Sequence, residues 1–254
     1  MRLALWQGEG VSGDIQATLA ETARVAAAAA RSGADLLVFP EGFLTGYYLP
    51  DLAPGRLGSV EDALAEVSGV AARTEIGIVM GSHTDDDRTL RNAAVVFDAT
   101  GAEIGRYCKR SLFGRWEKAT FAPGRDMLLF DCAGLSVGVA ICYDVEFPEL
   151  IRPYAQHRAD LVVVPTALMA PHDRIARQVV PVRALENQVF LAYCNRTGVE
   201  SDLNFVGLSC ICGPRGQVIT SASGSPELLL AELSQSDLAH EREENSYLRD
   251  LANL

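Results

Sequence analysis

The sequence predicts an α/β fold in which two β-sheets are covered by helices. Helical patterns alternate with short apolar runs of strand length along the 254 residues, as in folds built around parallel sheets. The segment 34–41 also has an echo at 159–166, since in each a buried strand follows a helix and stops at proline. No linker or low-complexity stretch divides the chain. We therefore expect one domain over residues 1–254, made of two similar α/β halves.

The first half begins with a strand, a helix and a second strand. Leu3–Trp6 is a short strand, and the helix Asp14–Arg31 is rich in alanine and ends at Gly33. Asp35–Phe39 is a continuous apolar run, typical of a strand covered on both faces. The elements expected next are a helix at Glu61–Arg73 and strands at Ile76–Gly81, Arg91–Phe97, Ala102–Lys109 and Met127–Asp131, with Asp85–Asp87 in a turn.

The second half is centred on the strand that precedes Cys142. Apolar residues from Leu135 to Ile141 alternate with small ones, and a period of two predicts a strand. Pro148 beside Glu149 is typical of a helix start, so Cys142 is expected on a turn between strand and helix. The elements expected next are helices at Pro148–His157 and Asp173–Asn187, the second kinked or broken at Pro181, strands at Leu161–Val164, Val189–Cys194, Asn204–Ile211, Gln217–Thr220 and Leu228–Leu233, and a charged helical tail from Ser236.

Composition and charge exclude several classes of partner. The net charge of −11 argues against nucleic acid and anionic membranes, which are bound by basic surfaces. Met1–Gln7 is too short and too polar for a signal peptide, and no apolar run has the length of a membrane span, so we expect a cytoplasmic protein. Its six cysteines are then expected to be reduced. The four histidines lie too far apart for a zinc site, so we expect no metal.

The turn at Cys142 suits a nucleophile. A cysteine reacts as its thiolate, which a helix N-terminus or a nearby cation favours. A sharp turn from strand to helix also exposes a side chain beside backbone N–H groups. The alternative is a buried structural cysteine, as most free cysteines are.

Two further reactive side chains are expected at strand ends, where open α/β sheets place their sites. Glu41 follows Pro40, and Lys109 ends a predicted strand. A carboxylate in a dry pocket acts as a general base, a cysteine forms a thioester with a carbonyl carbon, and an ammonium group stabilises the oxyanion. Taken alone, each residue has an equally good structural explanation: Glu41 as a solvated acid, Lys109 as a surface cation and Cys142 as a core cysteine. Together Glu41, Lys109 and Cys142 supply what acyl transfer needs.

The chain resembles the nitrilase, or carbon–nitrogen hydrolase, superfamily, whose catalytic set is Glu-Lys-Cys. The resemblance runs from Leu3 to about Leu233 and rests on an ordered motif around each of the three residues. These motifs are FPEGFLTGY at 39–47, YCKRSLF at 107–113 and VAICYD at 139–144, and FAPG at 121–124, RALEN at 183–187 and NRTG at 195–198 also look like family segments.

This resemblance implies a four-layer αββα sandwich that assembles as a homodimer or larger oligomer through its helices. We expect the tail from about residue 236 at that interface. The resemblance implies no metal and no organic cofactor. Glu117 matches a second glutamate of amidase members, which holds the substrate and the lysine in place. A solvated acid before Lys118 is the alternative for Glu117.

The resemblance also implies a mechanism. Glu41 takes the proton of Cys142, and the thiolate attacks an amide carbonyl. Lys109 and the backbone N–H of Tyr143 stabilise the oxyanion while Glu41 protonates the departing ammonia. Glu41 then activates the water that hydrolyses the thioester.

The residues after Cys142 favour an amidase. True nitrilases usually carry Cys-Trp-Glu where this chain has Cys-Tyr-Asp, and carbamoyl-amino-acid hydrolases place carboxylate-binding arginines where it has Val145 and Glu146. Glu146 is expected either to receive an amine, as in stereoselective amidases acting on amino-acid or cyclic-amine carboxamides, or to be an acid favoured by a helix N-terminus. The pocket residues that we expect are Tyr47, Tyr48, Phe113, Trp116, Glu146, Thr166 and Ala167.

Three alternatives to a small-amide amidase remain. A nitrilase or an N-carbamoyl amino acid amidohydrolase on the same scaffold would differ in its product. A Cys–His hydrolase would depend on His172. A catalytically silent binding protein would have no need of Glu41, Lys109 and Cys142 together.

Overall fold

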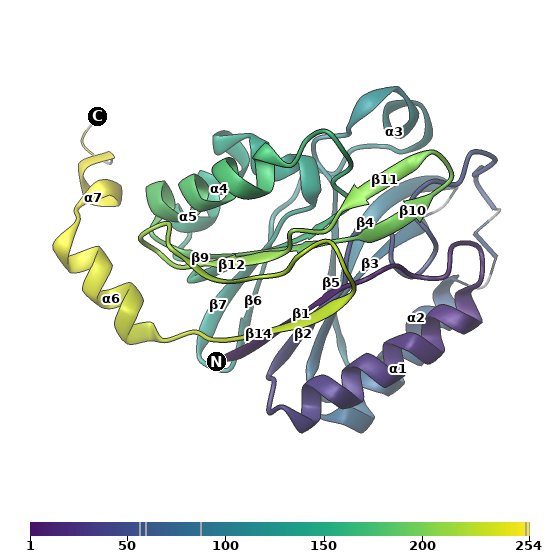
Figure 1. Cartoon of the computed structure of the whole chain (residues 1–254), viewed down its shortest axis with the longest axis horizontal. Helices are drawn as coiled ribbons and strands as arrows, with labels where there is room; N and C mark the ends of the chain where they lie inside the picture. The colour runs from purple at the N-terminus through teal and green to yellow at the C-terminus, as the bar shows by residue number, and fades with distance from the viewer. Residues whose placement is uncertain (56, 59, 87, 252, 254) are drawn as a thin grey trace.

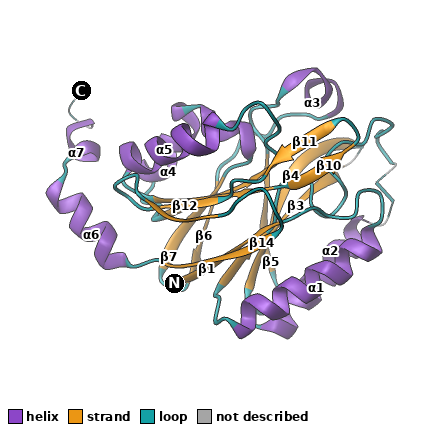
Figure 2. Cartoon of the chain, in the orientation of Figure 1, coloured by secondary structure: helices purple, strands orange, loops and turns teal. Residues whose placement is uncertain are grey.

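The computed structural model places the strands of the chain in two packed sheets with helices outside them. It describes residues 1–55, 57–58, 60–86, 88–251 and 253. Figures 1 and 2 show the strands between two helical layers, and each layer packs on the outer face of one sheet. The predicted four-layer αββα sandwich is therefore confirmed. The covering helices are α1 (Ile15–Arg31) and α2 (Val60–Thr74) on the first sheet, and α4 (Pro148–Gln156) and α5 (Val180–Asn187) on the second.

The first sheet has a parallel centre and antiparallel edges. Its order is β14-β1-β2-β3-β4-β5, with β1, β2 and β3 parallel and the other pairs antiparallel. These strands are β1 (Arg2–Gln7), β2 (Leu36–Val38), β3 (Gly77–Asp86), β4 (Thr89–Phe97), β5 (Glu103–Cys108) and β14 (Glu227–Glu232).

The second sheet repeats this pattern in the order β13-β12-β9-β8-β7-β6, with β7, β8 and β9 parallel. The two strands of the sequence echo, β2 and β8, occupy the same central place in their sheets. The two sheets therefore share the same succession of parallel and antiparallel pairs, as expected for two similar halves. The strands of this half are β6 (Leu128–Cys132), β7 (Leu135–Val139), β8 (Leu161–Thr166), β9 (Phe190–Asn195), β12 (Cys210–Cys212) and β13 (Val218–Ser221), and a separate hairpin holds β10 (Thr197–Glu200) and β11 (Leu203–Val206).

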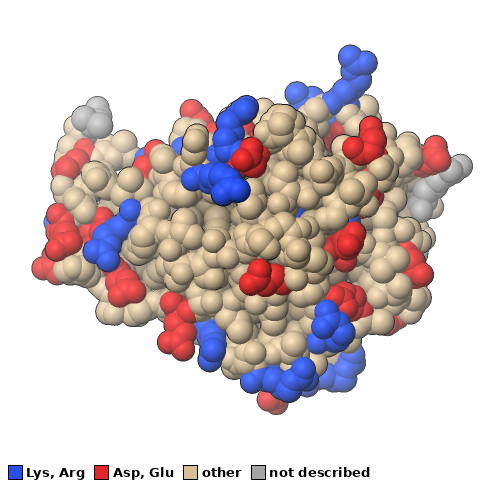
Figure 3. All heavy atoms as spheres, in the orientation of Figure 1, with Lys and Arg blue, Asp and Glu red and all other residues tan. Residues whose placement is uncertain are grey.

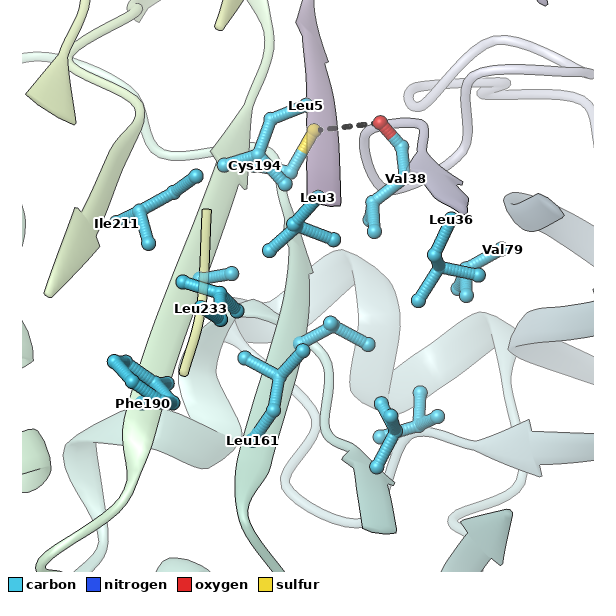
Figure 4. Packing of buried hydrophobic residues seen from close by; sticks show 14 of the residues in the cluster. Leu3, Leu5, Leu36, Val38, Val79, Leu161, Phe190, Cys194, Ile211 and Leu233 are labelled. Carbon is cyan, nitrogen blue, oxygen red and sulfur yellow. Dashed lines mark hydrogen bonds between the residues drawn. The ribbon is translucent and has the colours of Figure 1, made fainter. Parts of the chain in front are cut away.

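The interior between the two sheets is filled by apolar side chains from both. Leu3 of β1 and Phe190 of β9 are fully buried in this cluster, shown in Figure 4. The Cys194 thiol of the second sheet lies within hydrogen-bonding distance of the carbonyl oxygens of Val38 (3.2 Å) and Trp6 (3.3 Å) in the first, and its single S–H is shared between these two acceptors. Because each buried aliphatic or aromatic side chain contributes about 1.5–3 kcal/mol, this packing fixes the strand ends of one half against those of the other.

Helix boundaries follow the sequence signals. The Asp14 side chain caps α1 by accepting from the Ala17 N–H (2.9 Å), and Gly33 follows the helix in a left-handed conformation (φ 73°). The expected break at Pro181 is a π-helical turn, η2 (Ile175–Val179), that leads into α5. Proline has no N–H with which to continue the ladder of hydrogen bonds, which explains the change of helix type.

Two strand predictions and one turn prediction are wrong. The run Asn204–Ile211 is two strands, because Gly207 and Leu208 both have positive φ (64° and 59°) and end β11 before β12 begins. The strand β14 does not continue the sheet of β13 but crosses over to pair with β1. Asp85 and Asp86 lie in β3 rather than in a turn, paired with β4, and Asp87 lies outside the described residues.

Two elements, the strand β10 and the helix α3 (Gly114–Thr120), are absent from the sequence prediction, because they have no clear periodicity in the sequence.

The C-terminal tail packs on its own chain. It forms α6 (Gln235–Glu244) and α7 (Tyr247–Leu251), at the left of Figure 1. Leu238 of α6 is buried in the cluster between the sheets, and Arg242 donates to Asp160 Oδ1 (3.0 Å). A role of the tail in an oligomer interface stays a prediction.

The surface carries both signs of charge. On the face drawn in Figure 3, acidic and basic groups form small separate clusters between uncharged areas. Within the described ranges, no helix combines the length and the apolar content that a bilayer span requires.

Candidate active site

Glu41 is fully buried and has one oxygen free of hydrogen bonds. Its Oε1 accepts from Lys109 Nζ and from Asn92 Nδ2, both at 2.7 Å. Its Oε2 is buried with no hydrogen-bond partner among the described residues. Burial raises the pKa of Glu41 and the Glu117 charge adds to this, while Lys109 and Asn92 act in the opposite direction. A carboxylate of this kind is suited to accept a proton.

Glycine allows the chain to turn at Glu41. Gly42 has a positive φ of 59°, and a Cβ there would lie 2.9 Å from Tyr47 Cα. On the neighbouring strand β3, a Cβ on Gly81 would lie 1.9 Å from the carbonyl oxygen of Pro40. The motif around Glu41 therefore depends on close backbone approach as well as on the acid itself.

Lys109 lies directly after β5 and is held between two carboxylates. Its Nζ donates to Glu41 Oε1 and to Glu117 Oε1, both at 2.7 Å. Its backbone is fixed on both sides, because its N–H donates to Asn92 O and its carbonyl accepts from Gly124 N–H, both at 2.8 Å. Burial lowers the pKa of Lys109, but the two carboxylates outweigh burial and raise it above its ordinary value, so the ammonium group keeps its charge.

Glu117 connects Lys109 to two parts of the expected pocket. It lies in α3 with a relative exposure of 1%, so the alternative of a solvated acid is wrong. Its Oε1 also accepts from the Tyr47 hydroxyl (2.7 Å), and its Oε2 accepts from the Phe113 N–H (2.6 Å). Tyr47 was expected to be an apolar wall, whereas its hydroxyl is part of the polar network.

Cys142 starts the short 3-10 helix η1 (Cys142–Glu146), as expected for a turn between strand and helix. Its φ of 46° is in the left-handed region, which is strained for a residue with a side chain. Burial raises the pKa of the Cys142 thiol well above its ordinary value and Glu41 adds to this, while Lys109 and the Ala167 N–H lower it. The expected stabilisation of the thiolate is thus outweighed, and attack by Cys142 requires a base.

The aromatic residues of the expected pocket fall into two groups. In the first, the ring centroid of Trp116 lies 5.7 Å from that of Tyr47 and 5.0 Å from that of Tyr48, and Phe205 packs on Tyr47 (5.8 Å). Ala167 belongs to the same buried cluster. The second group contains Phe113, Tyr143, Phe147 and His172, with Phe113 lying 5.2 Å from Tyr143 and 6.2 Å from His172.

The three remaining candidates, Thr166, Glu146 and His172, differ in the groups that they contact. The Thr166 hydroxyl donates to Val164 O in its own strand (2.9 Å), so this hydroxyl is engaged within the sheet. Glu146 is half-buried, and no hydrogen bond joins its carboxylate to the described residues, although burial raises its pKa and the nearby His172 and Arg174 lower it. His172 therefore lies near Glu146, whereas the charged groups that shift the pKa of the Cys142 thiol are Glu41, Lys109 and Glu117.

Sequence reasoning assigned no role in the site to four polar residues. Asn92 is a lone amide within the apolar run of β4, which was the available signal. In the sequence, Asp144 serves only to distinguish an amidase from a nitrilase, yet Asp144 is fully buried. Arg196 and Glu200 form a buried ion pair (2.7 Å), and the Arg196 Nη1 also donates to the Gly42 carbonyl (3.2 Å), next to Glu41.

Comparisons with known proteins identify relatives along nearly the whole chain. The sequence model of the family described as carbon-nitrogen hydrolase matches residues 2–242. A nitrilase of Pyrococcus abyssi is 37% identical over 206 residues, with 78% of this chain and 76% of that protein covered. An (R)-stereoselective amidase of a Pseudomonas species is 31% identical over 255 residues, with 98% of this chain and 91% of that protein covered.

Among solved structures, an amidase from a Nesterenkonia species has a TM-score of 0.86 and 34% sequence identity, with 96% of this chain and 94% of that chain covered. Mutants of the amidase from Nesterenkonia sp. AN1 show acrylamide added to the active-site cysteine and the acetamide moiety of fluoroacetamide bound to it covalently. Another mutant holds butyramide.

Proposed function

The chain belongs to the carbon–nitrogen hydrolase family, and we propose that it is an amidase that hydrolyses a small linear carboxamide to a carboxylate and ammonia. One observation carries the proposal: the buried Lys109 ammonium lies between Glu41 and Glu117, and the second oxygen of Glu41 has no hydrogen bond among the described residues. Such a set provides a base and a fixed positive charge beside a neutral cysteine. The covalent adducts of the Nesterenkonia amidase with small amides support this substrate class.

In the first half-reaction, Glu41 Oε2 accepts the Cys142 proton as the sulfur attacks the amide carbon. The carbonyl electron pair moves onto oxygen, where Lys109 and the Tyr143 N–H stabilise it. Tyr143 lies in the first turn of η1, where backbone N–H groups have no acceptor within the helix. When the oxyanion collapses, the C–N bond breaks, Glu41 returns its proton to the leaving nitrogen, and ammonia and a thioester result.

In the second half-reaction, water replaces ammonia. Glu41 takes a proton from the water as its oxygen attacks the thioester carbon, and Lys109 again stabilises the oxyanion. The C–S bond then breaks, and the sulfur recovers a proton from Glu41 as the acid is released. We assign Glu117 the role of holding Lys109, because it accepts from that ammonium and from Tyr47.

The test is ammonia release from a panel containing butyramide, an amino-acid amide, a carbamoyl amino acid and a nitrile. We expect turnover of the amides, lost at least about 1000-fold in Cys142→Ala. The matched control is Cys132→Ala, which removes a half-buried cysteine at the end of β6 and should keep full activity. Full activity of Cys142→Ala would overturn the mechanism. Turnover of the nitrile alone would replace the amidase by a nitrilase, the second candidate, which the Pyrococcus relative favours.

We further propose that Glu146 selects amides that carry a protonated amine. Its half-buried carboxylate lacks hydrogen bonds with the described residues, which leaves it available to a cation. Glu146→Gln should raise KM about tenfold for an amino-acid amide and leave KM for butyramide unchanged, because only the first substrate loses a charged hydrogen bond. The exposed Glu149→Gln serves as control. Equal changes in KM for both amides would contradict this role and leave the helix-terminus explanation of Glu146.

We also propose that the whole chain acts as one catalytic domain, assembles as a homodimer or larger oligomer, and works in the reducing cytoplasm. Val182 of α5 and Tyr247 of α7 are apolar groups with relative exposures of 48% and 46%, as expected near a helical interface. All six cysteines are free, which suits a reducing compartment. Light scattering that gives the mass of one chain, 27.3 kDa, would contradict the oligomer.

A further inference from the structure

We infer that Asp144 is a positioning residue that fixes the segment carrying Lys109 against the turn carrying Cys142, an inference that rests on the proposed function. The Asp144 side chain is fully buried and accepts three hydrogen bonds. Its Oδ2 accepts from the Tyr107 hydroxyl (2.8 Å) and the Ile141 N–H (3.0 Å), and its Oδ1 accepts from the Ser111 N–H (2.7 Å).

The three donors come from the two segments that carry the reactive residues. Tyr107 and Ser111 lie two residues before and two residues after Lys109, so the carboxylate holds the lysine segment at both ends. Ile141 directly precedes Cys142. The lysine segment spans the end of β5 in the first sheet, and the cysteine turn follows β7 in the second. One carboxylate therefore binds the two reactive segments to each other across the halves.

A local role in capping η1 does not account for this arrangement. Capping needs only the bond from the Ile141 N–H, which Asp144 makes within its own turn. The bonds from Tyr107 and Ser111 reach residues more than thirty positions away. Because a buried carboxyl group is costly without hydrogen-bond partners, all three donors determine where the Asp144 side chain lies. The left-handed φ of Cys142 is a second reason why this turn needs external support.

Replacement by asparagine is a sharp test of this role. An ionised carboxylate only accepts hydrogen bonds, whereas an amide turns one NH₂ group toward donors, so Asp144→Asn loses at least one of the three bonds at nearly constant volume. We expect kcat for butyramide to fall about 100-fold, since a misplacement of about 1 Å costs that much, while KM stays within about threefold. Rates are expressed per folded molecule, with the folded fraction taken from circular dichroism.

Asp160→Asn is the matched control. Asp160 also joins separate segments, because it accepts from the Ser136 N–H (3.2 Å) and from Arg242 (3.0 Å), but it lies at the opposite end of the second sheet from Cys142. We expect this variant to lose stability and to keep kcat. If Asp160→Asn lowers kcat per folded molecule as much as Asp144→Asn does, the effect is general and the inference is overturned.

Tyr107→Phe tests the inference where Asp144→Asn fails to fold. It removes only the hydroxyl that joins the lysine segment to the carboxylate, and we expect kcat to fall about tenfold with KM unchanged. A kcat within about twofold of the unmodified protein would overturn the inference.

A readout independent of turnover separates this inference from the proposed function. The rate at which acrylamide adds to Cys142, followed by peptide mass spectrometry, depends on the position of Lys109, because the charge of Lys109 lowers the pKa of the Cys142 thiol. We expect slower addition in Tyr107→Phe and Asp144→Asn than in Asp160→Asn. If no amide of the panel is turned over, the proposed function fails, while unequal acrylamide rates still support the positioning role and equal rates overturn it.

Discussion

At Glu41 and Cys142, burial acts on two ionisable groups in the same direction. It raises the pKa of the carboxyl group and of the thiol, so each holds its proton more tightly than it does in water. Lys109 and Asn92 favour the ionised form of the Glu41 carboxyl group and so oppose the effect of burial. A base and a neutral nucleophile can thus stand side by side, which is the starting condition for the proposed proton transfer.

The pH dependence of kcat/KM should report the ionisation of Glu41. Its base form is required, so the rate should fall as pH drops through a pKa that lies above the ordinary value of 4.5. Asn92→Ala removes a hydrogen bond to the ionised carboxylate and should move this acid limb upward by about one pH unit. Asn245→Ala removes an equivalent Asn–Glu bond in the tail (2.6 Å) and should leave the limb unchanged. An acid limb at or below 4.5 would contradict Glu41 as the base.

His83 should make stability depend on pH. It is fully buried, its Nδ1 lies 3.3 Å from Thr45 Oγ1, and burial followed by the charges of Arg196 and Lys109 lowers its pKa to about 3 from 6.5. As pH falls below 6.5, the unfolded chain takes up a proton that the folded chain does not, so the free energy of unfolding decreases.

His83→Asn removes this titration. The stability difference between the unmodified protein and the variant should therefore shrink by about 2 kcal/mol between pH 7 and pH 5, measured by urea unfolding at each pH. His240→Asn changes an exposed histidine and should show no such trend. A difference for His83→Asn that is the same at both pH values would refute the neutral buried histidine.

At the scale of elements, β3 determines where the Glu41 turn can lie. A Cβ on Gly81 would lie 1.9 Å from Pro40 O and 2.8 Å from Glu41 Cα, so Gly81→Ala must push the turn away from the strand. We expect a loss of about 1–3 kcal/mol in stability and at least a tenfold lower kcat. In Gly105→Ala the new Cβ meets only the end of the Leu128 side chain (3.1 Å), so stability and kcat should hardly change. Equal effects of the two substitutions on kcat would contradict this account.

The elements that the sequence predicted well are those whose pattern is local. The buried runs of β2 and β8 and the alanine-rich α1 needed no knowledge of their partners. The helix α3 is short and has one buried residue, Glu117, so it offers no apolar period. The pairing of β14 with β1 joins the two ends of the chain, and nothing in either segment specifies that partner.

At the scale of the whole molecule, the site arises from two unequal halves. The end of β2 carries Glu41, whereas the end of its counterpart β8 carries Thr166, whose hydroxyl remains within its strand. The sequence motifs predicted Glu41, Lys109 and Cys142 as the candidate set, because a reactive residue at a strand end is a local feature. The contacts that hold the set together, such as Asn92 with Glu41 or Asp144 with Tyr107, join distant segments and needed the fold.

The ion pair of Arg196 and Glu200 is the clearest link between the halves. Arg196 Nη1 donates to the backbone carbonyl of Gly42 (3.2 Å), and Glu200 accepts from the N–H groups of Tyr47 (3.2 Å) and Tyr48. The pair therefore holds the segment after Glu41 from the opposite half. Both side chains are buried, so neither charge has bulk water as an alternative partner.

Arg177, like Arg196, forms an ion pair with an acid four residues away, but its pair is exposed. Comparing the two pairs therefore measures the effect of burial on stability. Arg196→Met leaves the Glu200 charge buried without its partner, so we expect the free energy of unfolding to fall by about 3–5 kcal/mol. Arg177→Met breaks the pair of Arg177 with Asp173 (3.3 Å), whose side chains are 61% and 53% exposed, and should cost at most about 0.5 kcal/mol. Urea unfolding of the two variants measures both values. Similar losses would mean that the buried pair contributes no more to stability than a surface pair, and would contradict its role in holding the two halves together.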